Sequence, residues 1–153
     1  MSNRRSFIRT SAAAAAGIGM STSLSATVLS PSRVLGANDR IHVALIGARN
    51  MGWYDLEDIL KQDNVECLTL CDVDSRVLED KVEQFRKRGG PLPSISMDYR
   101  TVLENKDIDA VIIGTPDHWH CLPTVEACEA GKHVYVEKPL ANSIGEINVM
   151  LDA

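Results

Sequence analysis

Short apolar runs alternate with amphipathic segments of helical periodicity from residue 41 onward, and this alternation restricts the fold more than any other feature of the chain. Runs of strand length lie at residues 41–46, 65–71, 95–97, 110–113 and 133–136. Helices are expected at residues 51–62, 75–88 and 99–105, between the fourth and fifth strands up to Ala130, and after Ser143. Strands that alternate with helices are typical of βαβ units, whose parallel strands are covered on both faces. The sequence therefore predicts an α/β fold with a doubly wound, mainly parallel sheet.

The first 37 residues differ in composition from the rest of the chain. Residues 3–9 read Asn-Arg-Arg-Ser-Phe-Ile-Arg and resemble the twin-arginine export motif of bacteria, and a weakly apolar run follows at residues 11–19. No run reaches the roughly 18 consecutive apolar residues of a membrane-spanning helix. We therefore expect an export signal and disordered linker at residues 1–37, a folded domain at residues 38–153, and a periplasmic or secreted protein. The alternative is an ordinary basic N-terminus on a disordered tail.

The charge of the chain restricts its partners. The net charge is −5, although residues 1–37 contain only arginines among their charged side chains, so the remaining domain is more acidic than this total. An acidic domain without a basic stripe argues against nucleic acid and against anionic membrane surfaces as partners.

Four cysteines are present, and we expect them to be small apolar residues. Cys67 and Cys71 lie four positions apart on one predicted strand. At about 3.3 Å per residue they would be roughly 13 Å apart, which is too far for a disulfide bond. The spacing of Cys121 and Cys128 does not resemble a zinc site.

A glycine-containing turn joins the first strand to the first helix. Gly47 and Gly52 match the first and third glycines of the dinucleotide-binding fingerprint of Rossmann domains. Asp72 ends the second strand, 20 residues after Gly52, where an acid would bind the adenosine ribose hydroxyls. This acid favours NAD over NADP, although nearby Arg76 weakens the preference. Arg49 replaces the middle glycine, so its side chain either points outward or contributes its guanidinium to the phosphates.

Ionisable residues also follow the last two strands. Residues 115–120 read Thr-Pro-Asp-His-Trp-His, and residues 137–140 read Glu-Lys-Pro-Leu. Ligands of open α/β sheets bind at the carboxyl ends of the strands, so both segments are candidate site loops. His118 and His120 would make a metal pair only with a third ligand, and the sequence offers none, so no metal is expected. His120 either touches the ligand or satisfies loop backbone groups.

These segments together resemble the glucose–fructose oxidoreductase / inositol dehydrogenase family (Gfo/Idh/MocA), over residues 40–153. The resemblance implies a Rossmann domain followed by a larger α/β domain, which supplies much of the sugar pocket and a catalytic histidine. It implies hydride exchange between NAD, with NADP as the alternative, and a carbon of a sugar or cyclitol. It also implies that a full-length protein forms a homo-oligomer.

The resemblance assigns roles to individual residues. Lys138 matches the family lysine near the substrate hydroxyl and the nicotinamide, and with His120 it is the predicted catalytic pair. Glu137 is expected to bind ribose or nicotinamide groups, or to pair with Lys138. The full set of predicted cofactor-binding residues is Gly47, Arg49, Asn50, Met51, Gly52, Asp72, Thr115, Pro116, Asp117, His120, Glu137 and Lys138.

The sequence stops at Ala153, within a helix that Ser143 and Glu146 begin with the spacing of a capping box. We therefore expect a chain cut before the family's second domain and without activity on its own. Three alternatives to an oxidoreductase half remain: an NAD-dependent glycosidase of a related branch, which Lys138 disfavours; a binding-only module without activity; and a cytoplasmic regulator, which Arg4 and Arg5 disfavour.

Overall fold

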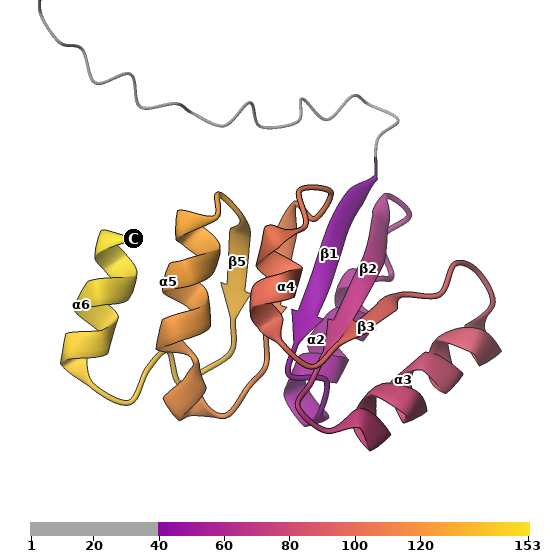
Figure 1. Cartoon of the computed structure of the whole chain (residues 1–153), viewed down its shortest axis with the longest axis horizontal. Helices are drawn as coiled ribbons and strands as arrows, with labels where there is room; N and C mark the ends of the chain where they lie inside the picture. The colour runs from indigo at the N-terminus through magenta and orange to yellow at the C-terminus, as the bar shows by residue number, and fades with distance from the viewer. Residues whose placement is uncertain (1–39) are drawn as a thin grey trace, which may run out of the picture. The chain divides into compact units, whose positions relative to one another are not determined.

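The computed structural model describes residues 40–153, which form a five-stranded parallel sheet with helices on both faces (Figure 1). The expected export signal at residues 1–37 lies outside the described residues. The strands are β1 (Ile41–Ile46), β2 (Val65–Cys71), β3 (Ser94–Ser96), β4 (Ala110–Ile113) and β5 (His133–Val136). The helices are α2 (Asn50–Ile59), α3 (Ser75–Arg88), α4 (Tyr99–Glu104), the 3₁₀ helix η1 (Asp117–Trp119), α5 (Cys121–Glu129) and α6 (Ile144–Asp152). The predicted α/β fold is confirmed.

The strand order is β3-β2-β1-β4-β5, so the chain progresses in one direction from β1 and then in the other from β4. This reversal between β1 and β4 is the switch point at which open parallel sheets bind ligands. The strands also end at one level, because Ile46 is paired with both Cys71 and Ile113, Cys71 with Ser96, and Ile113 with Val136. The residues that directly follow the strands therefore form one row along this edge: Met97, Asp72, Gly47, Gly114 and Glu137.

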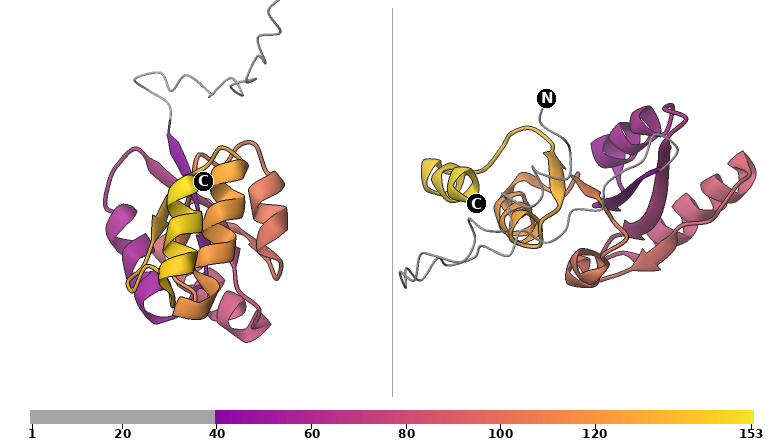
Figure 2. Two further views of the ribbon diagram at one scale, coloured as in Figure 1. Left: turned by 90° about the vertical axis from the view of Figure 1, so that its left-hand side faces the viewer. Right: turned by 90° about the horizontal axis from the view of Figure 1, so that it is seen from above.

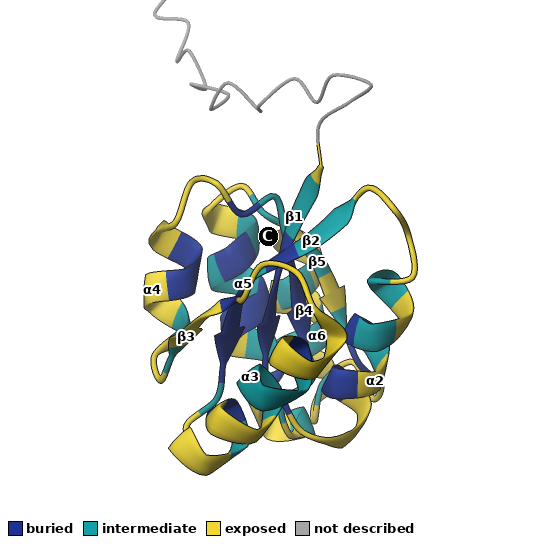
Figure 3. Ribbon diagram, turned by 90° about the vertical axis from the view of Figure 1, so that its right-hand side faces the viewer, coloured by how far each residue is buried: buried dark blue, intermediate teal, exposed yellow. Residues whose placement is uncertain are grey.

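Helices cover both faces of the sheet (Figure 2). One apolar cluster on each face packs them against the strands. Leu45 of β1 contributes to the cluster with α2 and α3, while its neighbours Ala44 and Ile46 contribute to the cluster with α4 and α5. This alternation is the two-residue period of a strand that is buried on both sides. Burying one such leucine or isoleucine contributes about 1.5–3 kcal/mol. The central strands are accordingly buried and the outer helix faces exposed (Figure 3).

The cysteines lie within this packing. Cys67 and Cys71 are buried, one in each cluster, and burial raises the pKa of each thiol to about 12. Cys121 and Cys128 are partly buried, and all four thiols are free. The expectation of unpaired, small apolar residues is therefore confirmed for the first two and holds in part for the others.

Two helices differ from their predicted bounds by more than one residue at an end. The first helix ends at Ile59 rather than at residue 62, because Lys61 and Gln62 donate to carbonyls three positions back and form a turn. The helix expected after β4 is divided into η1 and α5. The amides of Trp119 and His120 also bond to carbonyls three positions back, which gives the tighter 3₁₀ geometry.

Within residues 40–153, no helix is long and apolar enough to cross a membrane.

Candidate functional site

Three glycines bring the turn after β1 against the loop after β4. Gly47 has a φ of +88°, and a Cβ at this position would lie 2.7 Å from the carbonyl carbon of Gly114. A Cβ on Gly52 would lie 2.4 Å from the Gly47 oxygen. Real Cβ atoms do not approach other atoms this closely, so the turn requires glycine at both positions. The fingerprint predicted Gly47 and Gly52 but missed Gly114, whose signal was its position directly after a buried strand.

The N-terminus of α2 opens onto a cavity. Arg49 occupies the N-cap position without a side-chain hydrogen bond to the helix, and the first turn contains no acidic residue. The first amide groups of a helix lack partners within it and carry the positive end of the helix dipole, which favours an anion. Asn50 and Met51 line the adjoining cavity of about 390 Å³ together with Gly47. The turn can therefore receive a diphosphate.

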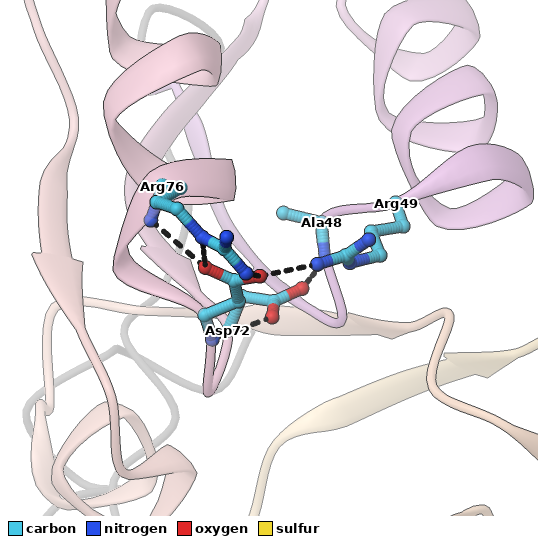
Figure 4. Close-up of polar contacts among 5 residues, drawn as sticks. Ala48, Arg49, Asp72 and Arg76 are labelled. Carbon is cyan, nitrogen blue, oxygen red and sulfur yellow. Dashed lines mark hydrogen bonds and ion pairs between the residues drawn. The ribbon is translucent and has the colours of Figure 1, made fainter.

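Asp72 faces this turn from the end of β2. Its Oδ2 accepts from the amide of Ala48 at 2.9 Å, and its Oδ1 accepts from the amide of Asp74 at 3.0 Å (Figure 4). These two hydrogen bonds fix the carboxylate. Among the described residues, Asp72 forms no salt bridge. Each carboxylate oxygen accepts more than one hydrogen bond, so capacity remains for two ribose hydroxyls. Asp72 lines the cavity beside the turn and also a second, apolar cavity that begins at the end of β2.

Arg49 points toward Asp74. One guanidinium nitrogen lies 2.5 Å from Asp74 Oδ2, and a nitrogen of Arg76 lies 2.9 Å from the same oxygen (Figure 4). Hydrogen bonds from Arg76 are the main reason that the pKa of Asp74 is lowered to about 2. The ion pair also raises the pKa of Arg76. The Arg49 guanidinium thus pairs with Asp74, but Arg49 also lines the cavity beside the turn, so both of its alternatives stay open.

An apolar cavity of about 470 Å³ continues from Asp72 along the ends of β2 and β3. Its lining includes large apolar side chains that are also exposed to solvent: Val73, Met97 and Trp119. Tyr99 and Pro116 also line it, and so do the polar residues Asp98, Arg100 and His118. These dimensions and this chemistry suit a flat heterocycle. The sequence analysis missed Val73, Met97 and Tyr99, although Val73 and Met97 lie within two residues of a strand end.

The opposite end of the crevice is formed by the loop after β5. Glu137 is 9% exposed, and it accepts from the Tyr135 hydroxyl at 3.4 Å and from the Lys138 amide at 3.1 Å. Lys138 is exposed and lines the cavity with Glu137, Thr115 and Gly114. Among the described residues, the Lys138 ammonium forms no salt bridge. Glu137 thus pairs with the lysine backbone, and the lysine side chain remains available to a ligand.

A partly buried carboxyl group, that of Asp55 in α2, interacts electrostatically with Glu137. Burial raises the pKa of Asp55 in α2, and the charges of Glu137 and Asp58 raise it further. Asp55 in turn is the main cause of the raised pKa of the Tyr135 hydroxyl. The crevice therefore has the positive end of the α2 dipole at the turn and the carboxylate of Glu137 beside Lys138.

His120 does not line either cavity. It is 1% exposed, with Nδ1 2.7 Å from the Pro139 carbonyl oxygen and Nε2 2.8 Å from the Thr115 carbonyl oxygen. Both ring nitrogens of His120 face backbone carbonyls, which favours the alternative in which it supports loop backbone, and its catalytic role stays a prediction. The imidazole joins the loop after β4 to the loop that contains Lys138.

Asp117 also departs from its predicted position. Its carboxylate accepts from the amide of His118 at 2.9 Å, within its own loop, and it does not line either cavity. Thr115 and Pro116, by contrast, line both cavities as predicted. No cluster of three or more metal-binding side chains occurs between residues 40 and 153.

Comparison with known proteins agrees with this geometry. The model of an oxidoreductase family with an NAD-binding Rossmann fold, Gfo/Idh/MocA, matches residues 41–153. A glycosyl hydrolase family 109 protein of Shewanella baltica is 31% identical, with 98% of this chain and 36% of the relative covered. A protein of the same name from Shewanella pealeana is 32% identical, with the same coverage. The chain thus spans 36% of the length of these curated relatives.

Solved structures give the same result. The WlbA dehydrogenase of Chromobacterium violaceum, in complex with NADH and UDP-GlcNAcA, superposes with a TM-score of 0.68 and 27% identity, over 76% of this chain and 32% of that one. A 3-ketoreductase variant from Actinomadura kijaniata, in complex with NADP, has a TM-score of 0.61 and 26% identity, over 74% and 35%. The residues at the strand ends, the family match and these neighbours converge: the chain belongs to the Gfo/Idh/MocA oxidoreductase family and contains its NAD-binding Rossmann domain.

Proposed function

We propose that this chain is the cofactor-binding half of an exported enzyme that transfers hydride between a nicotinamide cofactor and a carbon of a sugar or cyclitol. The observation that carries the proposal is the row of strand-end residues, which places Asp72, the open N-terminus of α2 and Lys138 along one crevice. A dinucleotide requires a hydroxyl acceptor, a diphosphate site and a reactive end in that order.

The residues of the crevice fit NAD(P) along its length. The apolar cavity beside Val73 and Tyr99 would receive adenine, and Asp72 would accept from the ribose hydroxyls. Asn50 and Met51 would offer backbone amides to the diphosphate. The carboxylate of Glu137 would favour the positive charge of the oxidised nicotinamide ring.

The bound cofactor supplies the hydride acceptor or donor. The Lys138 ammonium would then hold the substrate hydroxyl in line and stabilise the charge that develops on its oxygen. His120 would hold the backbone that positions Lys138, through the Pro139 carbonyl. The remaining walls of the substrate pocket would come from outside the 36% of the relatives' length that this chain spans. A homo-oligomer is proposed for a full-length protein from the resemblance to the family alone.

A second candidate is a glycosidase that uses NAD for a transient oxidation. The name of the curated relatives, glycosyl hydrolase family 109, favours it. The dehydrogenase neighbour with NADH and UDP-GlcNAcA, together with Lys138, favours the oxidoreductase. The two differ in net chemistry, since an oxidoreductase changes the redox state of one nicotinamide per turnover and a glycosidase releases a sugar without net change. Absorbance of NADH during turnover by a full-length relative separates them.

Export through the twin-arginine route is proposed from residues 3–9. Folding before export would let the domain leave the cytoplasm with its cofactor bound. Fusion of residues 1–37 to a reporter, with Arg4 and Arg5 both changed to lysine as the control, tests this step. Equal export of both fusions would refute the twin-arginine route.

Titration of the 153-residue chain with NADH, followed by its fluorescence, tests cofactor binding. We expect a saturable signal that Asp72→Ala weakens, because the ribose loses its acceptor. Circular dichroism shows whether the variant is folded. Absence of saturable binding by the folded wild-type chain, with both NADH and NADPH, would refute the proposal.

A further inference from the structure

Asp74 is the point at which two arginines from different elements meet. Arg49 reaches it from the turn after β1, and Arg76 reaches it from the first turn of α3 (Figure 4). Arg76 binds both carboxylate oxygens, with Nε 3.0 Å from Oδ1 and a terminal nitrogen 2.9 Å from Oδ2. Asp74 also caps α3, since Oδ1 accepts from the Arg76 amide. One carboxylate thus holds two guanidinium groups.

This cluster adjoins the position where the adenosine ribose would bind. The Asp74 amide donates to Asp72 Oδ1, so the two acids share one turn at the end of β2. NADP differs from NAD by a phosphate on the ribose 2′-oxygen, and Rossmann domains that accept it use an arginine near this acid. Here Arg49 and Arg76 are both paired with Asp74, and these two arginines with Asp72 and Asp74 have a net charge of zero. A third arginine, Arg100, lines the same cavity as Asp72 and is paired with Asp98.

We propose that Asp74 determines the cofactor preference of this domain, because it holds Arg49 and Arg76 away from the 2′-phosphate of NADP and so favours NAD. This inference rests on the proposed function. A phosphate monoester carries a charge of about −1.5 to −2 near neutral pH, so it would gain from a free guanidinium. To obtain one it must compete with the Asp74 carboxylate, which is bonded to both arginines and has 19% of its side chain exposed.

Asp74→Asn is the decisive substitution. Asparagine keeps an oxygen that can cap α3, while the charge that holds the arginines is lost. We expect the affinity of the full chain for NADPH to rise about tenfold, or about 1.4 kcal/mol. The affinity for NADH should change by less than about twofold, because Asp72 and the turn are unaltered; both affinities are measured by fluorescence titration. The gain should decrease as ionic strength rises, because it is electrostatic.

Two controls test whether the gain in NADPH affinity comes from releasing Arg49 and Arg76 from Asp74. Asp80→Asn removes the same charge from α3, but Asp80 contacts Gln84 and Lys81 rather than the arginines, so it should not change the ratio of affinities. Changing Arg49 and Arg76 to alanine in the Asp74→Asn background should abolish the gain. Asp74→Ser, which also preserves a cap, replaces Asp74→Asn if the latter fails to fold.

The outcomes are distinct. If wild type binds NADH but Asp74→Asn gains no affinity for NADPH, the role of Asp74 is refuted and the proposed function stands. An equal gain in NADPH affinity with Asp80→Asn would assign the effect to net charge and would also refute the role of Asp74. If wild type prefers NADPH, the arginines already bind the phosphate and the inference is wrong. If the folded wild type binds neither cofactor, the proposed function fails and this inference fails with it.

Discussion

Replacement of His120 by alanine should destabilise the domain more than it weakens cofactor binding. The imidazole is 1% exposed and lies between the carbonyl oxygens of Pro139 and Thr115, at 2.7 and 2.8 Å. A buried acceptor that loses its donor costs about 1–3 kcal/mol. The space left by the ring adds a cavity term of about 1 kcal/mol or more. We therefore expect a loss of about 3 kcal/mol in the free energy of unfolding.

Urea denaturation followed by circular dichroism measures this loss. His118→Ala is the matched control, because His118 lies in the same loop with 61% of its side chain exposed, and it should change stability by less than about 0.5 kcal/mol. NADH affinity is then measured under conditions where each variant is folded. Unchanged stability together with a large loss of NADH affinity would refute the structural role and favour His120 as a ligand-contacting residue.

Three other substitutions or modifications test the site and its packing. Gly114→Ala should destabilise the domain by several kcal/mol in urea denaturation, since the new Cβ would lie 2.3 Å from the Gly52 Cα. The control Gly145→Ala places its Cβ 3.9 Å from the Ser143 hydroxyl oxygen, an ordinary contact, and should be neutral or stabilising by up to about 1 kcal/mol. Lys138→Ala should leave NADH affinity within about threefold but reduce turnover of a full-length relative at the matching lysine at least about a hundredfold, and equal losses in both would contradict its role. Cys67 and Cys71, with pKa values raised to about 12, should resist iodoacetamide at pH 8 until the chain unfolds, and mass spectrometry that finds them alkylated in the folded chain would contradict their burial.

The sheet was predictable because its strands are apolar on both faces and its helices begin and end at local signals. The bounds of β1, β2, β4 and β5 agree with the sequence analysis, and the Ser143–Glu146 capping box is present at the start of α6. These features depend on neighbours in the sequence. The short β3 begins one residue earlier than expected, since it is defined by pairing with β2 rather than by its own composition.

The contacts that organise the site could not be predicted in the same way. His120 bonds to Pro139, 19 residues away, and Arg49 pairs with Asp74, 25 residues away. Local patterns do not specify such partners, so the sequence left both side chains with two alternatives. Gly114 and Met97 were missed because no fingerprint includes them, yet the alignment of the strand ends brings both to the crevice.

The central claim is that a dinucleotide occupies the crevice at the carboxyl ends of the strands, and amide chemical shifts of the isotope-labelled chain test it most directly. On titration with NADH, the account predicts saturable shifts at Ala48, Asn50, Met51 and Val73, with the amides of α6 unchanged. Shifts confined to α6 or to the opposite ends of the strands, with the turn unaffected, would contradict it.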